Sequence, residues 1–288
     1  MQVNAKGSET YDCPPTLNDQ GVIDFCKNGF LMLPGVVPDE INHKVVDYLD
    51  NVDGSSPTSS VGTQDFFVDG VFKNPQAAGA VRSLLGRDFT MPEQIANHRG
   101  PLPSIPPSGG WHRDGGTIYT HELEYLQVFY YPEAVTDDMG PTEVIPASHF
   151  VRLKHNMMSH YGTIADAVST ASVAGTIFLT VYGILHRRTR ATSGPTGRSK
   201  FRNLLKYDYW RTTPPKRDWI TEPSIDIGQV DFRPASRLFE QYHGAFAAAK
   251  MFCWLCGLED QYIKRGGQCW PIGQMGMPPA LQGTANDS

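Results

Sequence analysis

Trp111-His112-Arg113-Asp114-Gly115-Gly116 is the stretch of sequence that decides how this chain is interpreted. Side chains two residues apart on an extended segment point to the same side, so the imidazole of His112 and the carboxylate of Asp114 aim at one point. An imidazole and a carboxylate are two of the three protein ligands in a 2-His-1-carboxylate metal site. A second histidine, from a distant part of the chain, must then complete the set.

His186 is the candidate for that third ligand. It follows the apolar run 176–185, which predicts a buried strand, and it lies 186 − 114 = 72 residues beyond Asp114. A polar side chain at the end of a buried strand is well placed for a site at the mouth of a barrel. The alternative is that the His-x-Asp pair arises by chance and that His186 is an ordinary core or surface histidine.

Two arginines downstream of His186 favour the metal interpretation. Arg202 opens the segment 202–210, which predicts another strand, and Arg198 lies just before it. A guanidinium on a strand that faces the site can bind a dicarboxylate through two parallel hydrogen bonds. The sequence therefore predicts an anchor for an organic acid beside the metal.

The sequence pattern between residues 87 and 210 is typical of a jelly roll or a similar barrel. Short β-rich runs alternate there with loops rich in Gly and Pro, as in a double-sheet jelly roll. The expected strands of this region are Gln94–His98, Tyr125–Tyr131, Glu143–Ile145, Thr176–Leu185 and Phe201–Trp210. Upstream of it, the patterns predict strands over Phe30–Leu33 and Asp65–Val71, and helices over 16–28, from Pro38, and over 74–85.

These elements predict a mainly β fold with flanking helices and a jelly-roll, cupin-like core. We expect one domain over residues 16–265, with the jelly roll at about 87–210 and a C-terminal helical region at about 235–258. Residues 1–15 are expected to form a flexible leader and residues 266–288 an irregular tail.

Composition narrows the classes of partner. The formal net charge of −5 argues against nucleic acid or an anionic membrane surface. The N-terminus is polar, and no apolar run reaches the roughly 18 residues needed to span a bilayer. We therefore expect a cytoplasmic protein with its five cysteines reduced. Cys253 and Cys256 suggest a zinc site, but their apolar neighbours favour a buried helix.

Four segments, in this order, resemble one enzyme family. They are Gln20–Val37, Trp111–Gly115, the strand and turn over Leu126–Tyr131 and Asp138–His149, and His186-Arg187 followed by Arg202. Together they resemble the phytanoyl-CoA dioxygenase family of iron(II)- and 2-oxoglutarate-dependent oxygenases. The resemblance covers roughly residues 17–210.

The resemblance implies roles for named residues. His112, Asp114 and His186 would bind Fe(II), Arg202 would pair with the distal carboxylate of 2-oxoglutarate, and Gln127 would face the pocket near this co-substrate. Members usually carry Asn-x-Ser between the distal His and the Arg. This chain has Thr192-Ser193-Gly194-Pro195-Thr196-Gly197 there, so Thr192 or Ser193 is the candidate hydroxyl partner and Arg198 remains the alternative anchor.

The resemblance also implies an activity. A small molecule, such as a secondary-metabolite scaffold, would be oxidised while 2-oxoglutarate and O2 become succinate and CO2. Asp114 favours hydroxylation over halogenation, because related halogenases leave this ligand position empty for chloride. Desaturation, rearrangement or epimerisation by the same class of enzyme are alternatives, and so is a non-catalytic jelly-roll module that binds a ligand or metal. The sequence leaves the oligomeric state open.

Two further features lie near the expected site. Met157, Met158 and Tyr161 are candidates for a substrate lid, with an ordinary surface loop as the alternative and Leu102–Gly110 as a second lid candidate. Arg187, Arg188 and Arg190 form a basic cluster that either attracts an anionic substrate or is simply solvated.

Overall fold

The structure is a computed structural model of the chain. It describes residues 9–54, 56–99, 110–114, 120–151, 158–234, 241–265 and 274–282. The candidate lid residue Met157 and most of the second lid candidate, Leu102–Gly110, lie outside these ranges.

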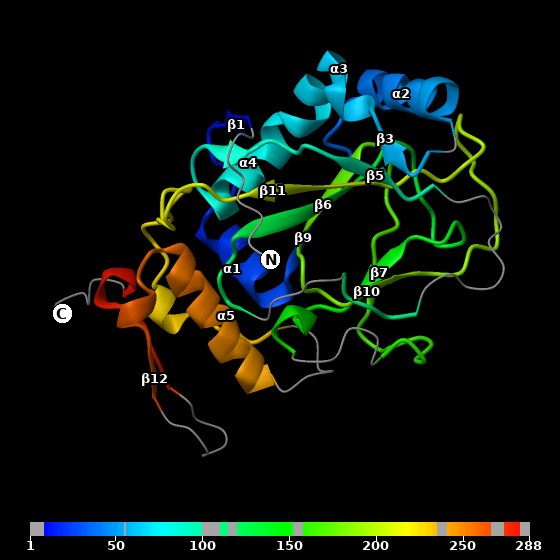
Figure 1. Ribbon diagram of the computed structural model, residues 1–288. Helices are drawn as coiled ribbons and strands as arrows, with labels where there is room; N and C mark the ends of the chain where they lie inside the picture. Colours follow the sequence, from blue (N-terminus) through cyan, green and yellow to red (C-terminus); the bar gives the residue numbers. More distant parts are fainter. Residues whose placement is uncertain are drawn as a thin grey trace.

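Two antiparallel sheets form the centre of the described chain (Figure 1). The larger sheet has six strands in the order β2-β9-β6-β11-β5-β3. Its strands are β2 (Phe30–Leu33), β9 (Thr176–Val181), β6 (Tyr125–Tyr131), β11 (Leu205–Trp210), β5 (Ile95–Asn97) and β3 (Thr58–Ser59). The smaller sheet has three strands in the order β10-β7-β8, with bounds His186–Arg188, Thr142–Val144 and Val168–Ser169. The predicted jelly-roll core is thus confirmed, and it also recruits β2 and β3 from upstream of residue 87.

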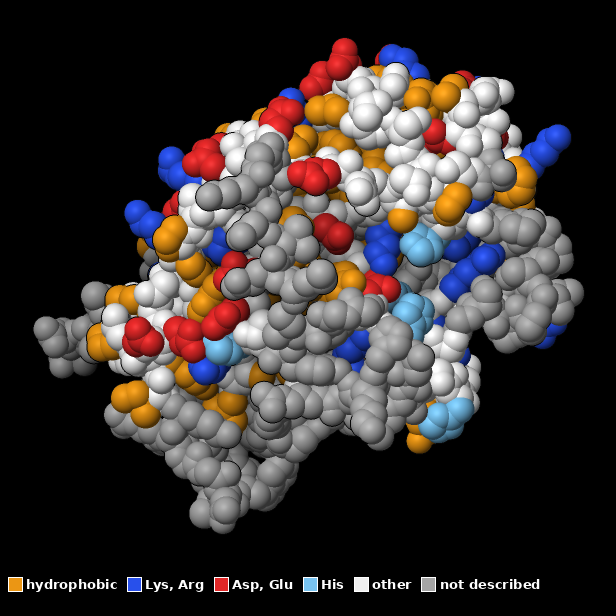
Figure 2. All heavy atoms as spheres, in the orientation of Figure 1, with side chains coloured by type: hydrophobic (Ala, Val, Ile, Leu, Met, Phe, Trp, Pro, Cys, Tyr) orange, Lys and Arg blue, Asp and Glu red, His pale blue; other side chains and the backbone are white. Residues whose placement is uncertain are grey.

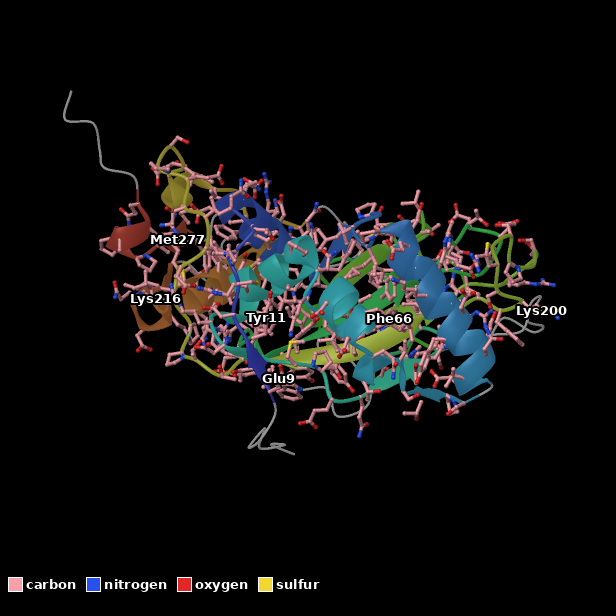
Figure 3. All side chains as sticks on the ribbon, turned by 90° about the horizontal axis from the view of Figure 1, so that it is seen from above. Glu9, Tyr11, Phe66, Lys200, Lys216 and Met277 are labelled. Atoms are coloured by element: carbon pink, nitrogen blue, oxygen red, sulfur yellow. The ribbon has the colours of Figure 1, made fainter. Side chains whose placement is uncertain are left out.

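Helices cover one face of the larger sheet (Figures 1 and 3). The α-helices are α1 (Asp19–Asn28), α2 (Asp39–Tyr48), α3 (Asp65–Phe67), α4 (Pro75–Leu85) and α5 (Gln241–Leu255). Two π-helical turns span Leu49–Asp53 and Val68–Phe72, and 3-10 turns span Val61–Thr63, Ser148–Phe150, Ile227–Gln229, Glu259–Gln261 and Pro279–Leu281. Among the described residues, no helix has both the length and the apolar character required to cross a bilayer.

The two faces of β6 have different surroundings. Leu126, Val128 and Tyr130 point into the main hydrophobic core, which they share with residues of the helices. Alternate residues, among them Gln127 and Phe129, point to the other face, where the candidate site lies. The pleat of one strand therefore separates the structural core from the functional side of the sheet.

Local sequence signals set the helix ends. The side chain of Asn18, within the stretch 16–19 predicted to cap this helix, accepts a hydrogen bond from the amide of Gly21 at 2.9 Å, and α1 therefore starts at Asp19. The helix stops at Gly29, whose φ of 79° suits glycine, and a Cβ there would lie 2.3 Å from the ring of His149.

The predicted strand over Asp65–Val71 is wrong, because this segment is helical. It forms α3 and the π-helical turn that follows, and it buries Phe67, Val71 and Phe72. These apolar residues recur at intervals that place them on one side of a helix, and the short apolar run concealed that period.

Both ends of the chain carry more structure than expected. Within the predicted leader, β1 (Thr10–Tyr11) pairs with β4 (Phe89–Thr90) and packs Tyr11 edge-on against Phe89. Within the predicted irregular tail, β13 (Gln274–Gly276) pairs with β12 (Ile263–Arg265). The partner of β1 lies far away in sequence, so local composition does not reveal this pairing.

Candidate active site

The structure brings the three predicted metal ligands together. His112 and His186 form an isolated antiparallel bridge, with reciprocal backbone hydrogen bonds of 3.0 Å, so the motif around His112 extends the smaller sheet beside β10. One ligand atom from each of His112, Asp114 and His186 lies within 4.8 Å of the other two. The Nε2 of His186 is 3.9 Å from Oδ2 of Asp114.

Both histidines are oriented as metal ligands. Nδ1 of His112 lies 2.9 Å from the carbonyl oxygen of Gly110, and Nδ1 of His186 lies 3.2 Å from that of Ile184. A backbone carbonyl accepts a hydrogen bond from the N–H at Nδ1, which leaves the lone pair on Nε2 for a cation. The donor set and its orientation therefore fit Fe(II), whose common ligands in such sites are two imidazoles and one carboxylate.

Burial and charge keep His186 and Asp114 in the forms that bind a metal. Burial, the largest influence on His186, lowers its pKa to about 4. Burial raises the pKa of Asp114, but His186, Lys206 and Gln127 more than offset this and bring it to about 2. Near neutral pH, His186 is therefore neutral and Asp114 is anionic.

Arg113, between the two ligands in sequence, holds their segment in place. Its side chain is fully buried, and it donates to the carbonyl oxygens of Gly183 at 2.6 Å and Ser148 at 2.6 Å. Because strand neighbours alternate in direction, Arg113 reaches into the protein while His112 and Asp114 face the cavity. The sequence offered no reason to single out this residue.

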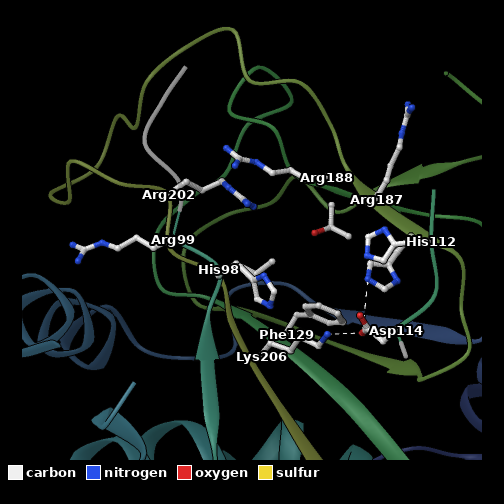
Figure 4. A pocket seen from close by; sticks show the side chains of 12 residues that line it. His98, Arg99, His112, Asp114, Phe129, Arg187, Arg188, Arg202 and Lys206 are labelled. Atoms are coloured by element: carbon white, nitrogen blue, oxygen red, sulfur yellow. Dashed lines mark hydrogen bonds and ion pairs between the residues drawn. The ribbon is translucent and has the colours of Figure 1, made fainter. Parts of the chain in front are cut away.

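A cavity of about 320 Å³ opens beside the three ligands (Figure 4). Basic residues dominate its lining, and Figure 2 shows basic and histidine side chains gathered around a hollow on this face. The lining residues are His98, Arg99, His112, Asp114, Phe129, Thr142, His186, Arg187, Arg188, Arg202, Leu204 and Lys206.

The four arginines of this lining differ in what they contact. Arg99 is paired with Asp50, and Arg187 donates to Glu143 at 2.8 Å. Arg202 is 3% exposed, and its Nε and Nη1 have no hydrogen-bond partner among the described residues. The same holds for Nε and Nη2 of Arg188. Both guanidiniums reach into the cavity (Figure 4), where an anionic group would satisfy these nitrogens.

The charge of Arg202 affects the pKa of Arg188. Burial lowers the pKa of Arg188 to about 10, and the charge of Arg202 contributes to the decrease. Burial also lowers the pKa of Arg202, whereas the phenol of Tyr131 acts to raise it. A buried and a partly buried cation that line the same cavity create a preference for an anion there.

The other predicted site residues have more varied positions. Gln127 is fully buried, and its Nε2 donates to Oδ2 of Asp114 at 2.7 Å, so it supports the carboxylate ligand and is not among the residues that line the cavity. Arg198 is exposed and paired with Asp47 at 2.9 Å, away from the lining. This contact favours Arg202 over Arg198 as the anchor.

Thr192 and Ser193 are not at the cavity. Their backbone amides both donate to the carbonyl oxygen of Asp138, and Thr192 is exposed, so neither of these two candidates for the hydroxyl partner lines the cavity. The hydroxyl-bearing residue of the lining is Thr142, which is 4% exposed and lies opposite Arg188 in the register of β7 and β10. The segment between His186 and Arg202 is longer than usual in the family, and its part around Thr192 lies away from the site.

The described part of the lid candidate lies beside the metal motif but does not line the cavity. Met158 packs against the cluster that contains Trp111 and Leu185, whereas Tyr161 is 53% exposed. Of the basic cluster, Arg187 is paired and Arg188 faces the cavity, while Arg190 is exposed. Arg188 was detectable from sequence, because it lies two residues after His186 and a strand directs both to one side.

The candidate zinc cysteines are core residues. Cys253, on α5, and Cys256, directly after it, are buried free thiols, and Sγ of Cys253 lies 3.6 Å from Sδ of Met277. Burial, the main influence, raises the pKa of Cys253 to about 12. A thiol that resists ionisation in this way is a poor metal ligand.

Solved structures share this architecture. HygX from Streptomyces hygroscopicus with iron bound is 15% identical, with a TM-score of 0.54 over 68% of this chain and 88% of that chain. The non-heme monooxygenase ThoJ, in complex with nickel, is 16% identical, with a TM-score of 0.50 over 82% of this chain and 96% of that chain. The non-heme alpha ketoglutarate dependent epimerase SnoN from nogalamycin biosynthesis is 13% identical, with a TM-score of 0.50 over 67% of this chain and 82% of that chain.

No protein-family model and no curated protein sequence matches this chain. At identities of 13–16%, the structural likeness establishes the jelly-roll fold. What the site does must be argued from its own residues.

Proposed function

We propose that this protein is an Fe(II)/2-oxoglutarate-dependent dioxygenase that oxidises a small organic molecule, most simply by hydroxylation. One observation carries the proposal: a 2-His-1-carboxylate set faces the same cavity as the buried Arg202 and the partly buried Arg188, neither of which pairs with an acidic side chain among the described residues. A metal and a dicarboxylate are the two ligands that such a cavity would satisfy together.

In this proposal each end of the cavity has a task. His112, Asp114 and His186 hold the metal, and Gln127 and Lys206 fix the carboxylate of Asp114. Arg202, assisted by Arg188, binds the distal carboxylate of 2-oxoglutarate, and Thr142 offers a hydroxyl beside them. The iron, when bound, supplies the activation of dioxygen that couples substrate oxidation to conversion of 2-oxoglutarate into succinate and carbon dioxide.

Proteins of the same fold lend the proposal support. HygX has been solved with nickel and 2-oxoglutarate bound, and again with hygromycin B as well. SnoN has been solved with Fe3+, alpha ketoglutarate and nogalamycin RO. We therefore infer a small-molecule substrate, with a natural product as the leading class, and we retain membership of the phytanoyl-CoA dioxygenase family and a cytoplasmic location as part of the proposal.

The test is spectroscopic and chemical. Anaerobic protein with Fe(II) and 2-oxoglutarate should show the weak visible absorption band of a 2-oxo acid chelated to Fe(II). Exposure to oxygen should then yield succinate, at a slow uncoupled rate even without substrate. A protein that binds metal but gives neither the band nor succinate would instead be a non-catalytic jelly-roll module.

A further inference from the structure

Beyond the metal ligands, the register of the larger sheet arranges side chains in three successive rows on the site face. Residues directly opposite each other on antiparallel strands share a face, so the pairing fixes which side chains lie together. From the cavity outward, the rows are Phe178, Phe129 and Lys206; then Thr180, Gln127 and Asp208; then Tyr125 and Trp210 with Tyr182 beside them.

The middle row reaches the metal site. Gln127 donates to the metal ligand Asp114, and Asp208 is the direct partner of Gln127 on the neighbouring strand. Side chains in such a pair have their Cβ atoms about 5 Å apart. Asp208 also lies two residues beyond Lys206 on β11, which places it ~7 Å further along the strand. Its carboxylate is therefore close to where chemistry would take place.

Asp208 is a carboxylate without a cation. Its Oδ1 is buried and has no hydrogen-bond partner among the described residues, and no described Lys or Arg lies within ion-pair distance of it. Lys206, the nearest ammonium in sequence, is committed to Asp114. Burial, the largest influence, raises the pKa of Asp208 to about 6. A ligand that brings a positive charge would relieve this cost of burial.

The outer row supplies aromatic faces next to that carboxylate. The rings of Tyr125 and Trp210 stack with centroids 4.2 Å apart and an interplanar angle of 17°, and Tyr182 lies 5.1 Å from Tyr125. All three side chains are partly exposed. Aromatic faces beside a carboxylate form the chemistry that recognises organic ammonium groups.

We propose that Asp208, with Tyr125, Tyr182 and Trp210, binds an ammonium group of the substrate. This inference rests on the proposed function and names the substrate class: a small organic amine, positively charged at neutral pH. The anionic co-substrate and the cationic substrate would then bind near opposite ends of β11. Arg202, just before the strand, serves the dicarboxylate, whereas Asp208 and Trp210, at its other end, serve the cation.

The experiment uses the full chain with Fe(II) and 2-oxoglutarate under anaerobic conditions. Two probes of similar shape are compared by calorimetry: 2-phenylethylammonium, which is a cation, and 2-phenylethanol, which is neutral. We expect the ammonium to bind about tenfold more tightly than the alcohol, because a hydrogen bond to a charged group is stronger than one between neutral groups. In Asp208→Asn this preference should vanish, through loss of ammonium affinity.

Asp231→Asn is the matched control, because Asp231 is an exposed carboxylate paired with Arg233 and its replacement makes the same change in net charge. It should retain the preference for the ammonium. Equal binding of both probes by the unmodified protein, or an Asp208→Asn variant that keeps the preference, overturns the cation site.

The visible band of Fe(II) with 2-oxoglutarate, recorded on the same samples, separates the two proposals. Its presence in Asp208→Asn shows that the variant is folded and loaded. If the band is absent throughout while the ammonium preference depends on Asp208, the oxygenase proposal fails and the cation site stands.

Discussion

The ammonium of Lys206 donates to Oδ2 of Asp114, the carboxylate oxygen that also accepts a hydrogen bond from Gln127 at 2.7 Å. Lys206 thus places a positive charge next to one of the three candidate metal ligands. The pairing keeps Asp114 ionised, but it also sets a fixed cation against the incoming metal ion. The first effect favours metal binding and the second opposes it. A substitution of Lys206 shows which of the two is larger.

We expect Lys206→Met to bind Ni(II) more tightly than the unmodified protein, by about tenfold, because repulsion between the ammonium and the metal is removed. Gln127 remains to orient the carboxylate. Calorimetry at low and high salt measures the effect, and Lys216→Met, which removes an exposed lysine, is the control. Weaker Ni(II) binding by Lys206→Met would mean that the ammonium chiefly positions Asp114.

The metal ligands make a second prediction. His112→Ala and Asp114→Ala should each abolish the visible band of Fe(II) with 2-oxoglutarate, since two ligands do not hold the metal in this geometry. His160→Ala, which removes an exposed histidine, should leave the band unchanged. A variant at either ligand position that keeps a band of full intensity contradicts the ligand assignment.

Substitutions at three arginines test which side chain binds the distal carboxylate of 2-oxoglutarate. Arg202→Ala should raise the 2-oxoglutarate concentration at half-saturation by about 100-fold, because a buried two-bond contact to a carboxylate is lost. Arg188→Gln should raise it by a smaller factor. Arg198→Ala should have no effect, since Arg198 pairs with Asp47 on the surface. Titration with 2-oxoglutarate, followed through the visible band, measures the half-saturating concentration for all three variants. An effect confined to Arg198→Ala would identify Arg198, rather than Arg202, as the anchor.

The metal triad and Arg202 could be proposed from sequence because their signals are local. His112 and Asp114 share a side through strand alternation, and His186 and Arg202 each adjoin a strong strand pattern. Thr142 and Asp208 carry no such signal. They join the site face through pairing with Arg188 and Gln127, and that register depends on loops whose paths the sequence does not specify.

The same distinction applies to the other residues that the family resemblance implies. It implies Thr192 or Ser193 as the hydroxyl partner, whereas the backbone amides of both donate to the carbonyl oxygen of Asp138. It implies Gln127 near the co-substrate, and the fold pairs the amide of Gln127 with Asp114. The longer strands β6 and β9 could be predicted from short sequence windows, whereas contacts between strands required the fold.

Gln127 should affect metal binding in the opposite sense to Lys206. Gln127→Leu removes the neutral hydrogen bond that fixes the Asp114 carboxylate, and losses of 10–100-fold in metal affinity are usual for such supporting contacts. Ni(II) calorimetry on Gln127→Leu and Lys206→Met under the same conditions measures both. Unchanged affinity in Gln127→Leu would show that Lys206 alone orients the carboxylate.

The pKa of His186 predicts how the stability of the metal-free protein changes with pH. Burial lowers this pKa to about 4 from an ordinary value of 6.5. Between these two values the unfolded chain binds a proton that the folded protein does not, so the free energy of unfolding falls as the pH decreases from 6.5 to about 4. Above pH 6.5 both states are neutral at this residue, and the effect disappears.

His186→Gln isolates this contribution, because glutamine does not titrate and the other buried histidine, His149, is unchanged. Urea unfolding in a chelator at pH 7 and pH 5 should show that the unmodified protein loses roughly 2 kcal/mol more than the variant between the two pH values. Equal losses in the two proteins would mean that folded His186 accepts a proton as readily as the unfolded chain does. That outcome would contradict the description of His186 as a neutral ligand already prepared for the metal.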